Sequence, residues 1–171
     1  MKIIDDFVPQ ETFDKLYSHI IGPWFPWYLQ NNSVSYKNDG NYQFTHQLVK
    51  DNIKDDGEES KANSLFKDFY NNLGVKELIR SKINLLHKTK KIKEFALHND
   101  CGVDVEPYTT AIFYFNTNNG YTIFKDGTKV ESVKNRLVQF DGYTPHSGST
   151  HTSKEPFRIV LNINYRWYND R

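Results

Sequence analysis

The last third of the chain contains the short runs that decide the fold: FALHND at residues 95–100, TTAIFYFN at 109–116, NGYTIF at 119–124, NRLVQFD at 135–141, PHSG at 145–148 and FRIVLNINY at 157–165. Several runs are rich in β-branched and aromatic residues, and Asn-Gly and Asp-Gly turn signals lie between them. Many short strands here, with helices grouped before them, predict a mainly β domain with flanking helices, a jelly roll.

A histidine and an aspartate two residues apart, with a second histidine far downstream, form the main chemical motif. On an extended chain the side chains of His98 and Asp100 point to the same side. His146 follows Pro145 directly after a predicted strand, and Gly148 comes two residues later. Two imidazoles and one carboxylate on one face of a metal form the open facial site of non-heme Fe(II) oxygenases. We therefore predict a metal site at His98, Asp100 and His146.

Arg158 begins the last predicted strand, at a position where a buried cation needs an anionic partner. A guanidinium holds a carboxylate by a bidentate, charge-assisted pair, and a free dicarboxylate could supply that partner. On a strand, alternate residues share a face. The face of Arg158 also carries Val160, Asn162 and Asn164, whereas the opposite face carries the apolar or aromatic residues Ile159, Leu161, Ile163 and Tyr165. We expect the first set to line a cavity and the second to face the opposite layer.

The order His98-x-Asp100, His146, Arg158 on a strand-rich scaffold resembles the 2-oxoglutarate/Fe(II)-dependent dioxygenases. Residues 110–122 resemble the prolyl-4-hydroxylase-type pattern, in which a T-x-x-x-Y-L-N strand leads into a Gly-Gly-x-Thr turn. Phe115 stands here for the leucine and Asn119 for one glycine. The N-terminal residues 3–8, followed by a helix, also resemble the start of such enzymes. The resemblance implies a double-stranded β-helix with the metal at its open end.

The resemblance also implies the chemistry and the roles of residues. Fe(II) would be held by His98, Asp100 and His146, and 2-oxoglutarate, the cosubstrate, would bind Arg158 through its distal carboxylate. Some family members carry a serine two residues after this arginine, where this chain has Val160. Further cosubstrate contacts are therefore expected from Asn84, Thr110, Tyr114 and Thr122, with structural roles for Asn84 and Tyr114 equally open. The implied reaction is hydroxylation of a peptidyl (prolyl-like) or small-molecule substrate, with release of succinate and CO2.

The other histidines and the cysteine have plainer interpretations. His151 competes with His146 for the distal metal position, but it lies in a Ser/Thr-rich stretch and we interpret it as a surface residue. His46 lies on a predicted strand face with aromatic residues, as core or pocket lining. We interpret His19 and His87 as structural or exposed residues. We assign Cys101 no catalytic role.

Length and composition limit the number of domains, the kinds of partner and the cellular location that can be expected. A chain of 171 residues predicts one domain, residues 1–171, with a helix-rich part at about 1–77 and a jelly-roll core at about 78–168. A net charge of +1 gives no electrostatic case for nucleic-acid or membrane binding. One cysteine excludes an internal disulfide framework. No apolar run approaches the roughly 18 residues of a membrane span, so we expect a cytoplasmic protein.

Periodicity predicts the elements before the core. A period of 3.6 predicts helices, and alternation predicts strands. The helices are expected over residues 11–20 and 63–73, with Gly74 ending the second. The strands are expected over residues 3–8, 41–49 and 78–86.

Substrate specificity is expected from segments outside the core strands, because those strands supply the metal ligands and the anion anchor. The candidates are the aromatic run from Trp24 to Tyr28, the polar loop from Asn31 to Gly40 and the turn at Tyr121. The aromatic run could equally belong to the core. Trp27 and Tyr28 could clamp a peptide or a small ring at low entropic cost.

Two alternative functions fit the same fold class. One is a metal-binding jelly-roll enzyme of the cupin type, whose two closely spaced histidines and glutamate differ from the motif here. The other is a non-catalytic binding or structural protein, for example one encoded by a phage, against which the intact ligand set argues. Stoichiometric succinate production would separate the oxygenase from both.

Overall fold

The computed structural model describes residues 1–31, 42–50, 59–101 and 106–167 of the chain. Its larger sheet contains β1 (Lys2–Ile4), β2 (Tyr28–Gln30), β3 (Gln43–Val49), β4 (Glu77–His87), β5 (Thr109–Tyr114), β8 (Arg136–Asp141) and β10 (Phe157–Arg166). Its smaller sheet contains β6 (Tyr121–Phe124), β7 (Lys129–Glu131) and β9 (His146–Gly148). The helical elements are α1 (Gln10–Ile20), the 3-10 helix η1 (Lys61–Phe66) and α2 (Lys67–Leu73).

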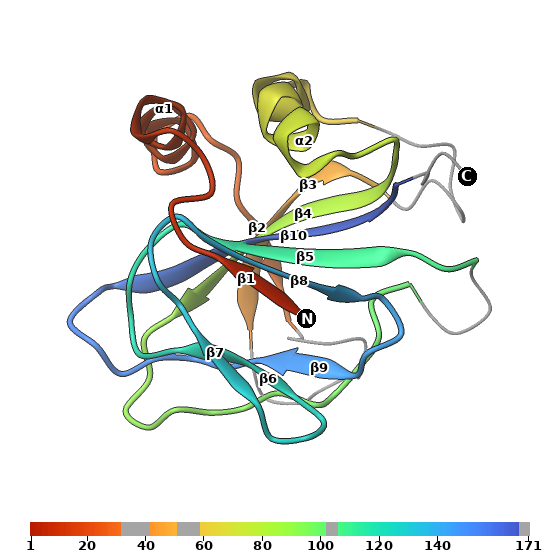
Figure 1. The fold of residues 1–171 in the computed structure, drawn as a ribbon. Helices are drawn as coiled ribbons and strands as arrows, with labels where there is room; N and C mark the ends of the chain where they lie inside the picture. The colour runs from red at the N-terminus through yellow and green to blue at the C-terminus, as the bar shows by residue number, and fades with distance from the viewer. Residues whose placement is uncertain (32–41, 51–58, 102–105, 168–171) are drawn as a thin grey trace.

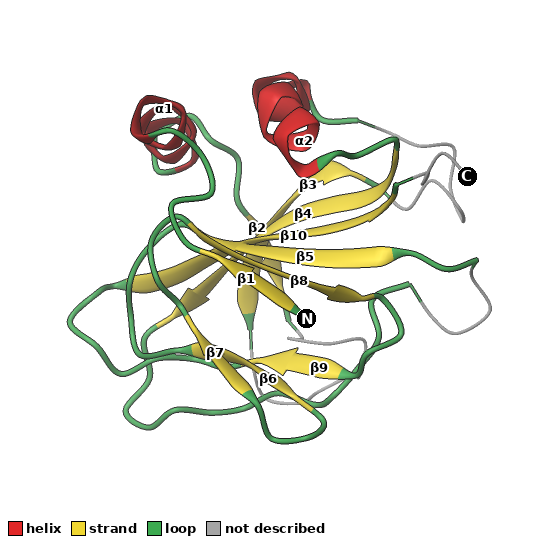
Figure 2. Cartoon of the chain, in the orientation of Figure 1, coloured by secondary structure: helices red, strands yellow, loops and turns green. Residues whose placement is uncertain are grey.

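The two sheets lie in layers, with both α-helices on the outer side of the larger one (Figures 1 and 2). The larger sheet has the strand order β1-β8-β5-β10-β4-β3-β2, and the smaller has the order β7-β6-β9. All pairings within them are antiparallel. The fold is thus mainly β with flanking helices, and the predicted jelly roll is confirmed. We call the space between the two sheets the interior.

Strand β10 lies at the centre of the larger sheet, between β5 and β4. Successive side chains of a strand point to opposite faces. The odd-numbered residues from Ile159 to Tyr165 are fully buried in the apolar core beneath the helices. The even-numbered residues from Arg158 to Asn164 face the interior, as the alternation in the sequence predicts. This strand therefore separates the structural core from the candidate site.

The helices cover the larger sheet through the apolar stripes expected from the sequence. Phe13, Leu16 and Ile20 of α1 are buried in the same core as β10. The second helix begins earlier than predicted and is divided, because the Ser60 hydroxyl accepts from Ala62 N (3.2 Å) and starts a 3-10 turn before α2. It ends as predicted at Gly74, whose φ of 75° lies in the left-handed region. Within the described residues, no helix is long and apolar enough to cross a membrane.

The first strand is shorter than predicted, and one asparagine holds the segment that follows it. β1 stops at Ile4, and Asp6 takes a φ of 50°, which turns the chain away from β8. Asn135 then bonds both backbone groups of Val8: Oδ1 accepts from Val8 N (3.1 Å) and Nδ2 donates to Val8 O (2.8 Å). Asn135 itself has a φ of 61° and is buried. It therefore ties the entry to α1 onto the sheet.

Two substitutions of Asn135 should separate the contribution of its side-chain hydrogen bonds to stability from that of its backbone conformation. Asn135→Ala is expected to lower the free energy of unfolding by about 2–4 kcal/mol, because it loses two buried bonds and strains a left-handed residue. Asn135→Gly should cost about 1 kcal/mol less, because glycine accepts positive φ. Chemical denaturation measures both, with exposed Asn72→Ala on α2 as the control. Equal losses for alanine and glycine would show that the backbone conformation contributes nothing.

Candidate metal centre and anion site

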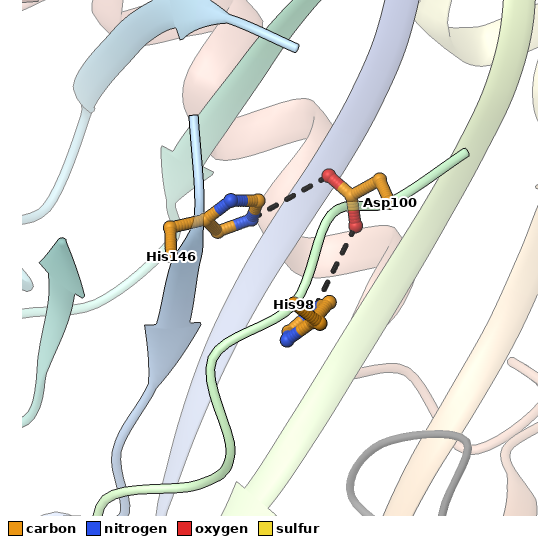
Figure 3. A group of neighbouring side chains, drawn as sticks. All are labelled: His98, Asp100 and His146. Atoms are coloured by element: carbon orange, nitrogen blue, oxygen red, sulfur yellow. Dashed lines mark ion pairs between the residues drawn. The ribbon is translucent and has the colours of Figure 1, made fainter. Parts of the chain in front are cut away.

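A short antiparallel bridge brings the two motif histidines together. His98 N donates to His146 O (3.0 Å), and His146 N donates to His98 O (3.1 Å). The segment of His98 is also held by Asn99, whose Nδ2 donates to Tyr143 O (2.8 Å). The imidazole rings lie with centroids 5.1 Å apart. The backbone thus brings residues far apart in sequence to one place in the interior, beside Asp100 (Figure 3).

Both imidazoles are held in the tautomer that a metal requires. His98 Nδ1 donates to Ala96 O (3.1 Å), and His146 Nδ1 donates to Thr144 O (3.0 Å). The Nε2 atoms therefore carry lone pairs, and they point toward the Asp100 carboxylate at 3.9 Å and 3.5 Å (Figure 3). Burial lowers the pKa of His98, which keeps this imidazole neutral at physiological pH. The orientation of both rings suits coordination through Nε2.

The Asp100 carboxylate is buried, ionised and held by several donors. Arg80 Nη2 donates to Oδ1 (2.7 Å), Asn162 Nδ2 lies within 3.1 Å and 3.2 Å of the two oxygens, and Asn164 Nδ2 donates to Oδ2 (3.1 Å). Burial alone would raise the pKa of Asp100, but the positive charge of Arg80 and the hydrogen bond from the Asn164 amide oppose it, and the pKa lies well below its usual range. The carboxylate therefore presents a fixed negative charge to the histidines.

The three side chains together could hold a divalent metal. One ligand atom from each of His98, Asp100 and His146 lies within 4.8 Å of the others. Two imidazoles and one carboxylate on one face match the donor set of a non-heme Fe(II) site. Phe140 packs its ring against His146 at 4.8 Å and shields one side of the group.

Arg158 is a buried cation in the interior, as the sequence predicts. Its side chain is 1% exposed, and its Nε donates to Ser132 Oγ (2.7 Å). Its guanidinium lies 5.6 Å from the centroid of the Tyr114 ring. Among the described residues no carboxylate forms an ion pair with it. Burial lowers the pKa of Arg158 to about 10, so the group remains charged at neutral pH and favours an anionic ligand.

Gly120 makes room for this arginine. A Cβ atom at position 120 would lie 2.7 Å from Arg158 Cδ. This glycine is the one that the Asn119-Gly120-Tyr121-Thr122 turn retains from the family pattern. Its role here is close approach to the arginine side chain.

The four further cosubstrate candidates lie in three places. The Tyr114 hydroxyl donates to Thr122 Oγ1 (2.8 Å), and this pair lies beside Arg158. Asn84 on β4 is paired with Val160 of β10, further along the interior. Thr110 lies instead beside the metal group, the name used from here on for His98, Asp100 and His146. Its Oγ1 accepts from Asn164 Nδ2 (3.0 Å), which also donates to Asp100. Roles of these residues toward a cosubstrate remain predictions.

The sequence analysis assigned no role to Arg80 or Ser132. Arg80 was recognisable only as one of several polar residues on alternate positions of β4. Ser132 lies outside the named motifs, between β7 and β8, and no periodicity marks it. Both are found only once the chain is folded, as partners of Asp100 and Arg158.

The remaining histidines lie outside the metal group. His151 is fully buried, so its interpretation as a surface residue is wrong: the chain around it pairs with residues 88–89, and Thr89 N donates to His151 O (3.0 Å). His46 is buried and structural, bonded through its two ring nitrogens to Pro26 O and Ser60 Oγ, each at 2.8 Å. His19 is exposed on α1, and His87 stacks on Tyr42.

The segments expected to give specificity divide between core and surface. Trp27 packs against the apolar core and donates from Nε1 to Ile20 O (3.2 Å), whereas Trp24 and Tyr28 are exposed. Tyr121 donates from its hydroxyl to Glu94 Oε1 (2.5 Å) beside Lys129. Most of the expected loop from Asn31 to Gly40 lies outside the described residues.

Comparison with known proteins supports the fold. The sequence matches no model of a known protein family and no curated protein. The structure is similar to a 2OG-Fe(II) oxygenase family oxidoreductase from Burkholderia pseudomallei, with a TM-score of 0.63 and 10% identity over 93% of this chain and 79% of that one. It is also similar to a Trichoplax adhaerens prolyl hydroxylase solved with a hypoxia inducible factor oxygen degradation domain peptide fragment, with a TM-score of 0.64 and 10% identity over 96% and 82%.

A Pseudomonas putida prolyl-4-hydroxylase is similar as well, with a TM-score of 0.57 and 14% identity over 98% of this chain and 92% of that one. The architecture is therefore that of the 2-oxoglutarate/Fe(II) oxygenases, prolyl hydroxylases among them. The resemblance carried by the sequence motifs is confirmed in the fold over most of the chain.

Alanine at position 98, 100 or 146 is expected to weaken Fe(II) binding by at least about 100-fold, since even the loss of an outer partner of a metal ligand costs up to that much. Anaerobic Fe(II) titration of each variant measures the effect. Exposed His19→Ala is the matched control and should bind normally.

His151, which is buried but is not part of the group His98, Asp100 and His146, provides a second comparison for this prediction. His151→Ala should lower the thermal stability and leave Fe(II) affinity unchanged. Loss of Fe(II) in His151→Ala together with its retention in His146→Ala would reverse the assignment of the distal ligand.

Proposed function

We propose that this chain is a 2-oxoglutarate- and Fe(II)-dependent oxygenase that hydroxylates a peptidyl or small-molecule substrate. The observation that carries the proposal is the pairing of two features in one interior. One is the group His98, Asp100 and His146, and the other is the buried charge of Arg158, with which no carboxylate of the described residues forms an ion pair. The fold, which solved 2OG-Fe(II) oxygenases share, supports the same function.

The residues at the first feature fit Fe(II). The two Nε2 lone pairs and the Asp100 carboxylate form a nitrogen and oxygen donor set on one face. The bonds from Nδ1 of each histidine to a backbone carbonyl fix the rings without using the coordinating atoms. This group contains an aspartate and no glutamate, so it differs from the ligand set of a cupin-type metal site.

The residues around Arg158 fit the distal carboxylate of 2-oxoglutarate. A buried guanidinium without a carboxylate partner is costly, and a bound dicarboxylate would remove that cost. Ser132 and Tyr114 hold the guanidinium in place through Nε and through its ring face, which leaves the remaining N–H groups to form the fork with a carboxylate. The Tyr114 and Thr122 hydroxyls add polar contacts nearby.

When bound, Fe(II) and 2-oxoglutarate would supply oxidation of the substrate by O2 with release of succinate and CO2. The protein contributes orientation and exclusion of water. Asp100 keeps its charge because Arg80, Asn162 and Asn164 hold it, and His98 stays neutral because it is buried. An apolar cluster that includes Ile112, Phe124, Phe140 and Val160 closes one half of the interior to water. Stoichiometric formation of succinate from 2-oxoglutarate, abolished by a chelator, tests the reaction.

A peptide substrate is one proposal for this site, because two of the similar structures are prolyl hydroxylases and one was solved with a peptide fragment. A small molecule is the other. The exposed side chains of Trp24 and Tyr28 offer surface for contact with either.

Arg158→Ala is expected to raise the Kd for 2-oxoglutarate at least about 30-fold and to leave Fe(II) bound, because removing one partner of a buried charge pair costs about 2–5 kcal/mol. Arg158→Lys should recover only part of the loss, since an ammonium lacks the planar fork. Calorimetric titration with Mn(II) in place of Fe(II) measures both affinities without turnover.

Arg166→Ala is the matched control for this experiment. Arg166 lies on the same strand and pairs with Glu77 (2.7 Å) instead of facing the anion site, so 2-oxoglutarate binding should not change. An unaltered affinity in Arg158→Ala would refute the cosubstrate role of Arg158 and leave the metal assignment standing.

A further inference from the structure

The interior has an apolar half and a polar half. The apolar half is lined by β5, β8 and the smaller sheet, with Tyr114, Phe124 and Phe140 among its buried residues. The polar half is formed by β3, β4 and the end of β10 that carries Asn162 and Asn164. Cross-strand neighbours in an antiparallel sheet share a face, so the register identifies which residues line this half.

Lys82 of β4 is a cation of the polar half for which the described residues supply no partner. It is paired in register with Asn162 of β10, whose amide contacts Asp100. Its backbone therefore lies about 5 Å, one strand spacing, from β10, the strand whose Asn162 and Asn164 donate to Asp100. Lys82 is partly buried, and among the described residues no hydrogen bond or ion pair is formed by its ammonium.

The nearest carboxylate does not neutralise Lys82. Asp100 already receives Arg80 at 2.7 Å and the two asparagine amides. Burial and, to a smaller extent, the positive charge of Arg80 lower the pKa of Lys82 to about 8 against the opposing effect of Asp100. A neighbouring anion would restore the charge and stabilise it.

Two amide oxygens beside Lys82 also lack partners. Asn162 Oδ1, opposite Lys82, and Asn84 Oδ1, two residues along β4 on the same face, are buried and have no hydrogen-bond partner among the described residues. Buried acceptors of this kind are normally satisfied by a ligand or by water. An ammonium and two acceptors, all without a partner among the described residues, lie next to one another, and the amide of Asn162 also contacts Asp100. Together they form a site for a polar molecule that carries both an anionic group and hydrogen-bond donors.

We propose that the polar half of the interior binds a carboxylate of the primary substrate, and that Lys82 is the residue that selects it. The proposal rests on the oxygenase function proposed above and names the class of its substrate. In the loaded site the positive charge of the divalent metal and the negative charge of the 2-oxoglutarate dianion cancel, and the charge of Arg80 cancels that of Asp100. The charges of Arg158 and Lys82 are left, so a substrate anion lowers the cost of burying Lys82. A neutral prolyl ring would leave the ammonium and both amide oxygens without partners.

The test compares acids with their amides on protein loaded with Mn(II) and saturated with 2-oxoglutarate, so that the anion site at Arg158 is filled and no turnover occurs. The small-molecule arm uses L-glutamate against L-glutamine. The peptide arm uses acetyl-Gly-Glu-Gly-amide against acetyl-Gly-Gln-Gly-amide, with acetyl-Gly-Pro-Gly-amide as the prolyl probe. Calorimetry measures the Kd of each for the wild type, Lys82→Gln, Lys82→Arg and the exposed control Lys67→Gln.

We expect at least one acid to bind the wild type about tenfold or more tightly than its amide and than the prolyl probe, as a hydrogen bond to a charged group predicts. The arm in which this occurs identifies a free acid or an acidic side chain as the source. Lys82→Gln should lose the preference, whereas Lys82→Arg and Lys67→Gln should keep it. Unchanged 2-oxoglutarate affinity in Lys82→Gln shows that this variant is folded.

Three results would overturn the inference: no binding of either acid, equal binding of acid, amide and prolyl probe, or an acid preference that survives in Lys82→Gln. Failure of the proposed function has a different signature. It would appear as wild-type protein that binds neither Mn(II) nor 2-oxoglutarate. The comparison of wild type with Lys82→Gln would then still decide whether Lys82 selects a carboxylate, because both proteins keep Arg158.

Discussion

The alternation of side chains along β10 is the constraint on which both the core and the site depend. Its odd-numbered residues enter the apolar core under the helices, and its even-numbered residues present Arg158, Asn162 and Asn164 to the interior. A slip of one residue would exchange the two sets and bury an arginine and two asparagines among Phe13 and Phe113. The apolar burial that fixes this register therefore also fixes the spacing between Arg158 and the amides that hold Asp100.

Charges in the interior are costly, and the fold offsets them locally. Asp100 is stabilised by a guanidinium and two amides, so its burial is matched by charge-assisted hydrogen bonds. Arg158 and Lys82 have no such carboxylate among the described residues, and burial lowers the pKa of each. Stability alone would not favour such cations. Their retention is understandable where a bound anion completes each site, which is the common basis of the two ligand proposals.

The sequence predicted the fold and the grouping of His98, Asp100 and His146 better than the contacts made by the residues around them. His98 and Asp100 could be paired from their spacing, and Arg158 could be assigned to the interior from the phase of its strand. Arg80 could not be found, because the sequence pattern of a polar residue on a strand is the same whether its side chain contacts solvent or a buried partner. Ser132 could not be found, because it lies between two strands, where no periodicity applies. His151 was misjudged for the opposite reason: its polar neighbours suggest a surface, whereas pairing of its backbone with residues 88–89 buries it.

The metal group lies at the boundary between the apolar and polar halves of the interior, and this position has a chemical consequence. His146 is bounded by the rings of Phe124 and Phe140, whereas Asp100 on the other side contacts Arg80 and two amides. A reactive centre at such a boundary is shielded from water on one side and given directional hydrogen bonds on the other. Under the proposed function, the apolar wall protects the oxidation and the polar wall orients the group to be oxidised. Selectivity would then depend on the charges of β4 and β10 more than on the surface aromatics, because a buried, unpartnered cation discriminates between ligands more strongly than an exposed ring.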